Sequence, residues 1–407
     1  MNGPGNGTTT HGMETIKTQV GIVGAGPSGL LLAQMLHLAG IDSVILESRP
    51  RSYIENRQRA GVLEHGVVRT LADCGVGARL AREGMVHEGI DIRFGETSHR
   101  LDVKALSGGQ CVTVYPQHEI VKDLVAARLQ TGRPLLFEAR VASLSDLESS
   151  RPRIRFEQEG ETRELACDFV AGCDGFHGIS RPAIPGDRID SYGRDYPFAW
   201  LGILAEAAPA SHEVIYAHHE RGFALQSMRS PTVSRLYLQC PVDDDVEQWS
   251  DDRIWSELHA RFATHDGFRL NEGRIVQKSL TPMRSFVAAP MRHGRLMLAG
   301  DAAHIVPPTG AKGLNSAVGD VRVMAAALEA YYRHGDGDLL ERYSEIALRR
   351  VWKTQRFAAS LCTLLHRFHD EPRFHMRMQL AELEQIVEDP RAAELFARNY
   401  TGLPFDV

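Results

Sequence analysis

The hydrophobic pattern near the amino terminus predicts a strand, a helix and a second strand in close succession. Residues 18–23 form an apolar run that is typical of a buried strand, and a glycine-rich turn follows it. Apolar positions continue at helical spacing over residues 30–38, and Ala39-Gly40 ends the predicted helix. A second apolar run, residues 43–46, stops just before Glu47. We therefore expect a βαβ unit at the start of the fold.

Two other patterns divide the rest of the chain. From about residue 199 to residue 241, apolar and polar residues alternate with turn signals between the runs, which predicts a mixed or antiparallel sheet. After about Gly313 the pattern is helical almost to the end. The sequence shows neither an internal repeat nor a low-complexity linker, so we expect closely packed units. The predicted fold class is α/β (α+β) with a Rossmann-type unit.

Composition and charge narrow the possible functions. The chain has 407 residues, of which 43% are hydrophobic, and it lacks the apolar run of about 18 residues that predicts a membrane-spanning helix. A net charge of −6, spread without long blocks, provides no basic surface for nucleic acid or for an anionic membrane. Residues 1–17 lack the features of a secretory signal, so we expect a disordered leader, with Met13 as an alternative start.

Cysteine and histidine positions bear on redox and metal chemistry. The 6 cysteines are scattered without a Cys-x-x-Cys pair, which indicates reduced thiols in a cytoplasmic protein. A redox pair formed by Cys167 and Cys173 is the alternative. His366 and His369 have the spacing of one helical face, but Pro372 interrupts the helix before the next histidine. We therefore expect a solvated helix end there and no metal site.

A glycine turn, Gly24-Ala25-Gly26-Pro27-Ser28-Gly29, joins the first predicted strand to the first predicted helix. Gly24 permits the tight turn, Gly26 lets backbone amides approach a pyrophosphate, and Gly29 allows the helix to pack closely. The helix amino terminus favours the negative charge of the ligand. Glu47, which closes the second strand, can then hold ribose hydroxyls. These residues predict a dinucleotide site without distinguishing FAD from NAD.

Two later segments favour FAD. One predicted strand ends in Asp174-Gly175, and another ends in Gly300-Asp301. Together with the glycine turn, and in this order, they resemble the three signatures of the aromatic-ring FAD-dependent monooxygenases. In that family the carboxylate that matches Asp301 binds the ribityl chain of FAD. The segment that matches Asp174-Gly175 lies near both dinucleotides.

The resemblance covers residues 18–404 and, within the family, is closest to the branch that hydroxylates 4-hydroxybenzoate. It implies a FAD-binding domain over residues 18–86, 113–195 and 284–312, and a substrate domain over residues 87–112 and 196–283. Residues 313–407 would form a helical interface region of a homodimer. Further residues that match FAD contacts, besides the glycine turn with Ser28, are Arg57, Arg59, Ala60, Val62, Gln117, Arg235, Leu314 and Asn315.

The resemblance also implies a substrate site in the middle of the chain. Arg229 matches the residue that binds the benzoate carboxylate, and its planar fork of donors suits that group. Ser227 and Tyr237 match residues that add hydroxyl hydrogen bonds. Tyr216 and Tyr400 match a pair that conducts the phenolic proton away, which makes the neighbouring ring carbon a better nucleophile.

The implied reaction uses NAD(P)H and O2, forms a flavin C4a-hydroperoxide and yields 3,4-dihydroxybenzoate. His87 resembles the outlet of the proton relay, and the backbone carbonyl of Pro308 matches the group that senses the phenol proton. Ser48 departs from the family pattern, because members selective for NADPH place a basic residue there, but Arg49, Arg51 and Tyr53 could still meet a 2′-phosphate. We therefore expect NADPH, with NADH as the alternative. The residues that match contacts with this reductant are Arg49, Tyr53, His177 and Arg284.

Two alternatives remain open at this point. Gln226 and Leu236 depart from the family pattern close to the expected pocket, so a sister hydroxylase for another hydroxybenzoate or an aminobenzoate is possible. A flavoprotein reductase without hydroxylation is the second alternative. In such a reductase Arg229 and the pair Tyr216 and Tyr400 would lack a purpose.

Overall fold

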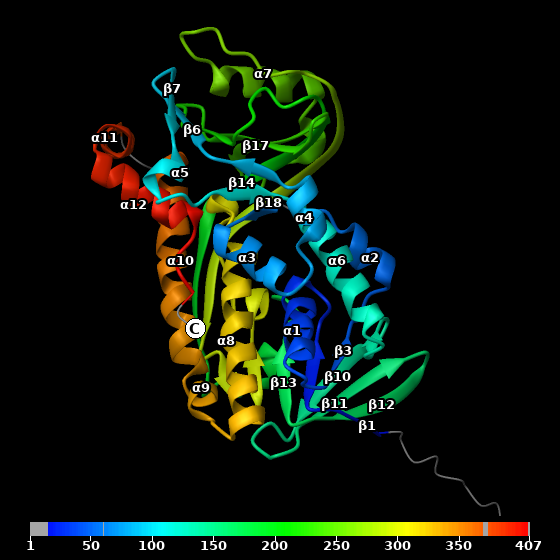
Figure 1. The fold of residues 1–407 in the computed structure, drawn as a ribbon. Coiled ribbons are helices and arrows are strands. Elements are labelled where there is room, and N and C mark those ends of the chain that lie inside the picture. Colours follow the sequence, from blue (N-terminus) through cyan, green and yellow to red (C-terminus); the bar gives the residue numbers. More distant parts are fainter. Residues whose placement is uncertain (1–14, 60, 369–372, 406–407) are drawn as a thin grey trace, which may run out of the picture.

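The computed structural model describes residues 15–59, 61–368 and 373–405. A parallel sheet with covering helices forms one lobe, a second sheet forms the other, and the last helices lie along the side of both (Figure 1). Ala60 and the segment that contains His369 and Pro372 lie outside the described residues, as does most of the predicted leader. Among the described residues, none of the helices is long and apolar enough to cross a membrane.

The first lobe contains a six-stranded sheet in the order β19-β20-β13-β2-β3-β9. All its neighbouring strands are parallel except the pair β19 and β20. The helix α1 (Pro27–Leu38) connects β2 to β3, which confirms the expected βαβ unit. The strands are β19 (Arg292–His293), β20 (Leu296–Leu298), β13 (Phe169–Gly172), β2 (Val20–Val23), β3 (Ser43–Leu46) and β9 (Leu135–Leu136).

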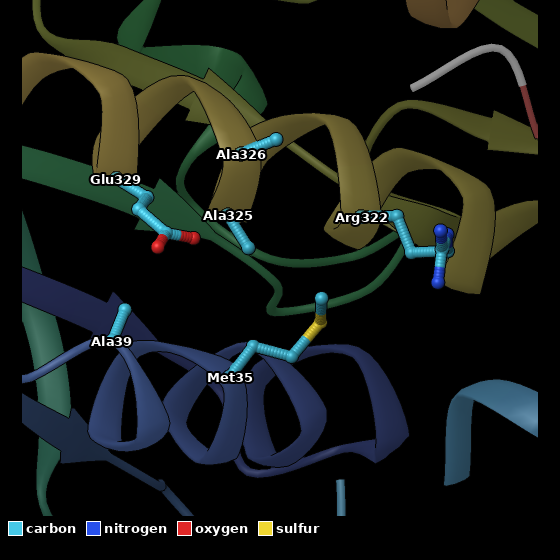
Figure 2. A pocket seen from close by; sticks show the side chains of 6 residues that line it. All are labelled: Met35, Ala39, Arg322, Ala325, Ala326 and Glu329. Carbon is cyan, nitrogen blue, oxygen red and sulfur yellow. The ribbon is translucent and has the colours of Figure 1, made fainter. Parts of the chain in front are cut away.

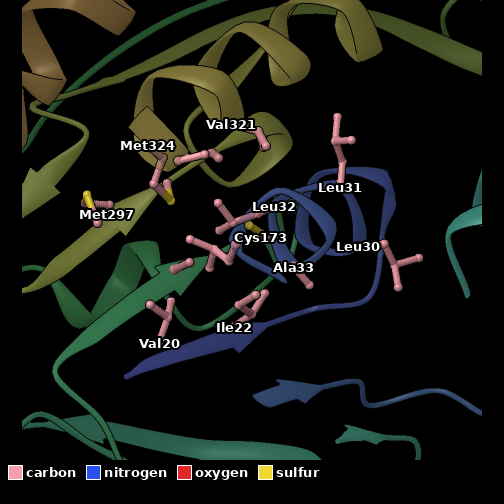
Figure 3. Close-up of a cluster of buried hydrophobic side chains, with 14 of the residues drawn as sticks. Val20, Ile22, Leu30, Leu31, Leu32, Ala33, Cys173, Met297, Val321 and Met324 are labelled. Atoms are coloured by element: carbon pink, nitrogen blue, oxygen red, sulfur yellow. The ribbon is translucent and has the colours of Figure 1, made fainter. Parts of the chain in front are cut away.

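Apolar side chains on both faces of this sheet explain why its strands read as continuous hydrophobic runs. Every residue of β2 is buried, as expected for a parallel strand covered on both sides. Figure 3 shows Val20 and Ile22 of β2 close to Leu32 of α1, with Met324 of the helix α8 (Gly313–His334) nearby. Full burial of each large aliphatic side chain contributes about 1.5–3 kcal/mol. The helices α1 and α8 are thereby fixed against the sheet.

The second lobe is built on an eight-stranded mixed sheet, as the alternating pattern predicts. Its order is β21-β18-β14-β17-β16-β15-β6-β7, with β15 and β6 parallel and the other pairs antiparallel. The strands are β21 (His304–Ile305), β18 (Arg274–Ala289), β14 (Asp190–Glu206), β17 (Val233–Pro241), β16 (Ala224–Ser230), β15 (Ile215–Ala217), β6 (Ile90–Phe94) and β7 (Thr97–Leu101).

The two faces of this sheet pack against different helices. Alternate residues such as Trp200 and Tyr216 face a core shared with the last helices of the chain. The residues between them, such as Leu201 and Ile215, pack with α7 (Asp251–Phe262) in a separate core. A substrate site on one face is therefore insulated from the other face by the sheet.

Two long strands connect the lobes. β14 and β18 pair antiparallel from Asp190 with Ala289 to Glu206 with Arg274 (Figure 1). They run across the boundaries expected near residues 195 and 284, because a continuous ribbon serves both lobes. The register shifts between Asp195 and Ala199, which marks the bend from one lobe into the other.

The carboxyl-terminal region is helical, as predicted. After α8 it contains α9 (Asp338–Glu341), α10 (Tyr343–Leu365), α11 (Arg373–Glu388) and α12 (Pro390–Thr401). The remaining helices are α2 (Arg51–Asn56), α3 (His65–Asp73), α4 (Ala78–Glu83), α5 (Val103–Leu106) and α6 (Gln117–Gln130).

Two small sheets complete the fold. One has the order β4 (Val62–Leu63), β8 (Val112–Val114) and β5 (Met85–His87). The other has the order β1 (Thr15–Lys17), β12 (Glu161–Ala166), β11 (Arg153–Gln158) and β10 (Arg140–Ser145). The expected leader over residues 1–17 is therefore wrong at its end, because β1 pairs in parallel with β12.

Candidate active site

Four motif residues meet at the carboxyl edge of the six-stranded sheet. Because β2, β3, β13 and β20 are parallel, the residues that follow them emerge at the same edge. The turns are tied together: Gly24 N–H donates to the Leu46 carbonyl at 2.8 Å, and Ala299 N–H donates to the Gly172 carbonyl at 3.0 Å. We call this the cofactor edge, defined by Gly24, Glu47, Asp174 and Asp301.

The three glycines of the turn have different neighbours. A Cβ on Gly24, whose φ is +100°, would lie 2.5 Å from the Cys173 carbonyl oxygen, and one on Gly29 would lie 2.1 Å from the Gly24 oxygen. Both positions are thus dictated by close backbone packing. A Cβ on Gly26 would meet no protein atom within 4 Å. Gly26 therefore borders open space, as expected where a pyrophosphate approaches the helix amino terminus.

The carboxylates at the cofactor edge are held by backbone donors. Glu47 is buried and accepts hydrogen bonds from the backbone N–H groups of Ala25 and Arg49, each at 2.8 Å. Asp174 accepts from Ser180 N–H at 2.9 Å through one oxygen, while its other oxygen is buried without a partner among the described residues. Burial raises the pKa of Asp174, although the Ser180 bonds oppose this. The unpaired oxygen, the open Gly26 and the exposed Asp301 fit a bound dinucleotide.

The expected flavin segment near Arg59 packs beside the start of α6. Tyr115 N–H donates to the Gly61 carbonyl at 2.8 Å, and Val62 pairs with Val114, so this segment lies next to Gln117. Arg57 and Arg59 are exposed. Desolvation and then Arg57 lower the pKa of Arg59, while Asp301 opposes them, so the Arg59 guanidinium lies within electrostatic reach of the cofactor edge.

Asn315 connects this segment to the loop that precedes α8. Its side-chain oxygen accepts from Glu64 N–H at 2.9 Å, and its side-chain nitrogen donates to the Val62 carbonyl at 2.9 Å. Leu314, beside it, is half-buried against the core of the first lobe. The structure therefore brings Val62 next to Asn315, which is adjacent to Leu314, although about 250 positions separate Val62 from both.

A buried ionic group next to this loop was not predicted. Lys312 Nζ donates to Glu64 at 2.6 Å and to the Tyr400 carbonyl at 2.8 Å, and Arg350 donates to the other oxygen of Glu64 at 3.0 Å. Burial lowers the pKa of Lys312, and Glu64 opposes the shift. Glu64 follows Val62 by two positions and Lys312 precedes Leu314 by two, so both lie beside residues that match FAD contacts, although neither has a role assigned from the sequence.

The substrate residues lie on one face of the eight-stranded sheet. Tyr216 and Tyr237 both pair with Leu225, on either side of it, and alternation puts Ser227 on the same face. The register shifts between Met228 and Ser230, so Arg229 is the extra residue of a β-bulge, a feature that redirects a side chain. We call Tyr216, Ser227, Arg229 and Tyr237, together with Tyr400, the substrate face.

The guanidinium of Arg229 has no hydrogen bond or ion pair with the described residues. Burial lowers the pKa of Arg229, while Tyr237 raises it and Arg235 lowers it further, so all three side chains are close together. Arg235 lies 5.1 Å from the centroid of the Tyr237 ring, and its Nε is buried without a partner among the described residues. Two poorly paired guanidinium groups beside tyrosines form a site prepared for an anion.

Tyr216 and Tyr400 meet although 184 positions separate them. Their hydroxyl oxygens are 3.1 Å apart, and both side chains are buried. Burial and then Tyr400 raise the pKa of Tyr216 well above its ordinary value, and burial raises the pKa of Tyr400 to about 12. Both phenols are therefore neutral near pH 7 and can pass a proton along a hydrogen bond.

The structure does not join His87 to this pair by a hydrogen bond. His87 is buried, its Nε2 lies 3.4 Å from the sulfur of Met228, and its Nδ1 has no partner among the described residues. Burial lowers the pKa of His87 to about 4. Pro308 is exposed in a short turn, and its carbonyl accepts from Ala311 N–H at 2.9 Å.

Gln226 and Leu236 lie away from the substrate face, which corrects the expectation that they border the pocket. They pair with each other, and the period of two directs both to the opposite face. Gln226 is buried and accepts from Ala210 N–H at 3.3 Å, and Leu236 packs in the core that includes α7. These two departures therefore give no reason to prefer a sister substrate.

Trp200 and His366 support the same face and were not predicted for this role. Trp200 Nε1 donates to His366 Nε2 at 2.7 Å, and the Trp200 ring lies 4.6 Å from the ring of Tyr237. His366 is fully buried, and burial lowers its pKa to about 3. The expectation of a solvated helix end is therefore wrong at His366, which is a neutral hydrogen-bond acceptor in the core.

The residues expected to contact the reductant form two groups. His177 and Arg284 both approach Phe176, with centroid distances of 5.0 Å between the rings of His177 and Phe176 and 5.2 Å from the Arg284 guanidinium to the Phe176 ring. Arg49 lies 5.2 Å from the centroid of the exposed Tyr53 ring. His177 and Arg284 thus share Phe176 as a neighbour, whereas Arg49 and Tyr53 contact each other.

Metal and disulfide chemistry find no support within the described ranges. No group of three or more His, Cys, Asp or Glu side chains there is placed to hold a metal ion. Cys167 and Cys173 are buried free thiols, and burial raises the pKa of Cys167 to about 12.

A surface hollow of about 190 Å³ lies between α1 and α8 (Figure 2) and is separate from the site. Its lining residues are Met35, Ala39, Arg322, Ala325, Ala326 and Glu329.

Comparisons with known proteins agree with this geometry. Residues 17–358 match the FAD binding domain family. The chain is 46% identical to p-hydroxybenzoate hydroxylase of Acinetobacter baylyi, an alignment that covers 97% of this chain and 98% of the relative. A 3-(3-hydroxy-phenyl)propionate/3-hydroxycinnamic acid hydroxylase of Mycobacterium avium is 27% identical over 84% of this chain and 59% of its own length.

Solved structures show the same fold. A p-nitrophenol 4-monooxygenase from Pseudomonas putida superposes with a TM-score of 0.81 at 20% identity, over 96% of this chain and 100% of that chain. The anhydrotetracycline hydroxylase from Streptomyces rimosus superposes with a TM-score of 0.75 at 23% identity, over 96% of this chain and 77% of that chain. The family match over most of the chain and the relative at 46% identity establish the family. This chain belongs to the FAD-dependent aromatic hydroxylases.

Proposed function

We propose that this enzyme hydroxylates 4-hydroxybenzoate at the ring carbon beside its hydroxyl group, yielding 3,4-dihydroxybenzoate and consuming NADPH and O2. One observation carries the proposal: the guanidinium of Arg229 is unpaired, and it lies on the same face as the hydroxyl pair of Tyr216 and Tyr400. A guanidinium fits a carboxylate bidentately, and a buried phenol pair fits the other end of a phenolic acid. The name of the relative at 46% identity supports the same substrate.

Each end of the substrate has a proposed partner. Arg229 binds the carboxylate, with Ser227 and Tyr237 as hydroxyl partners, and the ring lies against the apolar core that includes Leu225. The phenol donates its proton toward Tyr216, which passes a proton to Tyr400. Partial removal of this proton raises the electron density at the adjacent ring carbon.

The cofactor edge holds FAD in this proposal. FAD, when bound, accepts electrons from the reductant and transfers one oxygen atom from O2 to the ring. Asp301 accepts a hydrogen bond from the ribityl chain, and the turn with Gly26 receives the pyrophosphate. The other proposed contacts are Gly24, Ser28, Gly29, Glu47, Arg57, Arg59, Ala60, Val62, Gln117, Asp174, Arg235, Leu314 and Asn315.

Two further roles complete the proposed site. Pro308 presents its carbonyl to the phenol, and His87 serves as the outlet of the relay, which requires His87 to become accessible during turnover because it is buried here. NADPH contacts His177 and Arg284 with its nicotinamide half and Arg49 and Tyr53 with its adenosine half. Cationic and aromatic side chains suit a 2′-phosphate and an adenine ring.

We also propose the segmental domain division given by the sequence, a homodimer and a cytoplasmic location. The helices α11 and α12 expose large apolar side chains, with Phe374 at 71%, Met378 at 55% and Leu395 at 60% exposure, which supports contact with a second copy. Light scattering on the purified holoenzyme tests the dimer, and a mass of one chain would refute it.

The cysteines are free, and most of them are buried, which supports the proposed location in a reducing compartment.

A panel of substituted benzoates tests the proposed activity. We expect oxidation of NADPH by the holoenzyme to be accelerated strongly by 4-hydroxybenzoate, with 3,4-dihydroxybenzoate formed in proportion. Stimulation only by 3-hydroxybenzoate, an aminobenzoate or a dihydroxybenzoate would assign a sister substrate instead. Oxidation coupled only to hydrogen peroxide with every compound would indicate a reductase.

A further inference from the structure

A buried acidic residue on α8 is bonded to both ends of the turn that carries Asp301. One carboxylate oxygen of Asp320 accepts from Gly300 N–H at 2.9 Å and lies 2.6 Å from His304 Nε2. The side chains of Asp320 and His304 are each 2% exposed. Gly300 directly precedes Asp301, and His304 follows it by three positions. One carboxylate therefore clamps the five-residue segment 300–304.

Other contacts also hold the backbone of this segment, since Arg181 donates to the Ala302 carbonyl at 3.0 Å and Ala288 N–H donates to the Ala303 carbonyl at 2.8 Å. Gly300 adopts a φ of +61°, and a Cβ there would lie 2.8 Å from Ser28 Oγ of the glycine turn. Ala303 N–H donates to the Gly300 carbonyl at 2.8 Å, and His304 begins β21 by pairing with Val287. Ordering a glycine and a short turn costs conformational entropy, which the Asp320 contacts offset.

The charges of the pair complement each other. Burial alone disfavours an imidazolium, but the charge and hydrogen bond of Asp320 together raise the pKa of His304 above its ordinary value. A buried carboxylate that accepts from a histidine ring N–H and a backbone N–H is satisfied without contact with the ligand. The Gly300 N–H group is likewise occupied, so Asp301 is the polar side chain of the turn that remains exposed for the cofactor.

We propose that His304 and Asp320 are positioning residues for FAD: they hold the Gly300-Asp301 turn in the shape that receives the ribityl chain before the cofactor arrives. They act through Asp301 and contact no reacting atom. A turn that is ordered in the free protein loses less entropy on binding, which increases affinity. The inference rests on the proposed contact between Asp301 and FAD.

FAD titration of the apoprotein, prepared by removing FAD from the holoenzyme, tests this role. Asp320→Asn should raise the dissociation constant for FAD at least about tenfold, the factor that corresponds to about 1.4 kcal/mol. For the same variant saturated with FAD, the dissociation constant of 4-hydroxybenzoate should change by less than about twofold. Quenching of flavin fluorescence reports the first constant, and the change in the flavin spectrum on adding the benzoate reports the second.

Asp168→Asn is the matched control. Asp168 also links α8 to the six-stranded sheet, because it accepts from Tyr332 OH at 2.9 Å, but it precedes β13 and so lies at the opposite edge. This variant should lose a similar amount of thermal stability and keep its affinity for FAD. Equal weakening of FAD binding in both variants would show general destabilisation and overturn the positioning role.

Two more variants keep the outcome decisive. If Asp320→Asn does not yield folded apoprotein by circular dichroism, His304→Gln provides the same test with a neutral donor. Unchanged FAD affinity in a folded variant would refute the inference, provided that Asp301→Asn weakens FAD binding. If Asp301→Asn also leaves the affinity unchanged, the proposed contact of Asp301 fails, and the positioning role fails with it.

Discussion

The cofactor edge and the substrate face differ in how their residues are brought together. Each residue at the cofactor edge lies within three positions of the end of a parallel strand, so a short local motif carries both the residue and its placement. The substrate face combines Tyr216, Arg229 and Tyr237 from three neighbouring antiparallel strands with Tyr400 from α12. Backbone geometry therefore defines the first region, whereas strand register and helix packing define the second.

The pKa values of the buried histidines in the two regions are shifted in opposite directions. His304 at the cofactor edge faces Asp320, and its pKa is raised. His366 behind the substrate face accepts from an uncharged indole N–H, and its pKa is lowered to about 3. A charged partner therefore supports the first histidine and an uncharged partner the second, and the charged groups named beside the substrate face are Arg229, proposed to bind the carboxylate, and Arg235.

The strongest test of the cofactor edge replaces two glycines of the turn that begins at Gly24. Gly29→Ala should abolish FAD binding and destabilise the fold by several kcal/mol, on the order of 3, because the added Cβ would lie 2.1 Å from the Gly24 carbonyl oxygen. Gly26→Ala should leave apoprotein stability nearly unchanged and still weaken FAD binding, because its Cβ meets open space in the protein. Thermal unfolding of the apoproteins and FAD titration separate the two effects. Equal stability of both apoproteins would contradict the assignment of Gly29 to close backbone packing and of Gly26 to the ligand side of the turn.

The next largest effect should come from the tyrosine pair. Tyr216→Phe removes the partner 3.1 Å from the Tyr400 hydroxyl, so hydroxylation should slow about 10²-fold while the substrate still binds. Rapid-reaction measurement of product formation in the FAD-saturated enzyme checks this expectation. Tyr332→Phe is the control, since the Tyr332 hydroxyl donates to Asp168 at the other edge of the first lobe. An unchanged rate in Tyr216→Phe would remove the pair from the mechanism.

Arg229→Lys should weaken binding of 4-hydroxybenzoate by about 30-fold, or about 2 kcal/mol, because a lysine replaces a bidentate contact with a single donor. The spectral change of bound FAD on titration with the benzoate measures the dissociation constant. Arg221→Lys alters an exposed arginine near the same sheet, paired with Glu257, and should have no effect. FAD affinity should be unaffected in both variants. A normal dissociation constant in Arg229→Lys would place the carboxylate elsewhere.

A separate expected effect is a loss of stability in acid that originates at two buried histidines near the substrate face. His366 and His87 have folded pKa values of about 3 and about 4, below the value of about 6.5 expected in the unfolded chain. Their contribution is therefore complete above about pH 6.5 and declines as the pH falls toward 4, by at most about 1.4 kcal/mol per pH unit for each histidine.

Urea unfolding of the apoprotein at pH 7 and pH 5 measures this decline. His366→Gln keeps an acceptor for the Trp200 N–H group without a titrating ring, so its stability should depend less on pH. His265→Gln, which changes a histidine whose side chain is 73% exposed, should behave like the parent protein. Identical pH dependence in all three proteins would mean that His366 is not buried neutral.

The sequence alone determined the βαβ unit, the glycine turn, the two later strand motifs and the helical end of the chain. These features depend on residues adjacent in sequence, since a parallel strand followed by a turn places its next residue at a known edge. Family resemblance alone proposed Tyr216 and Tyr400 as partners; the structure places their hydroxyls 3.1 Å apart. Even the short strand β1 escaped prediction, because its pairing partner β12 is remote in sequence.

Tertiary structure decided which residues face the substrate and which support them. The register that pairs Gln226 with Leu236 directs both away from the substrate face, and a β-bulge redirects Arg229; neither the register nor the bulge follows from composition. Lys312 with Glu64, and His304 with Asp320, became pairs only when distant segments packed. Contacts across the fold depend on register and on burial of charge, and a sequence read position by position specifies neither.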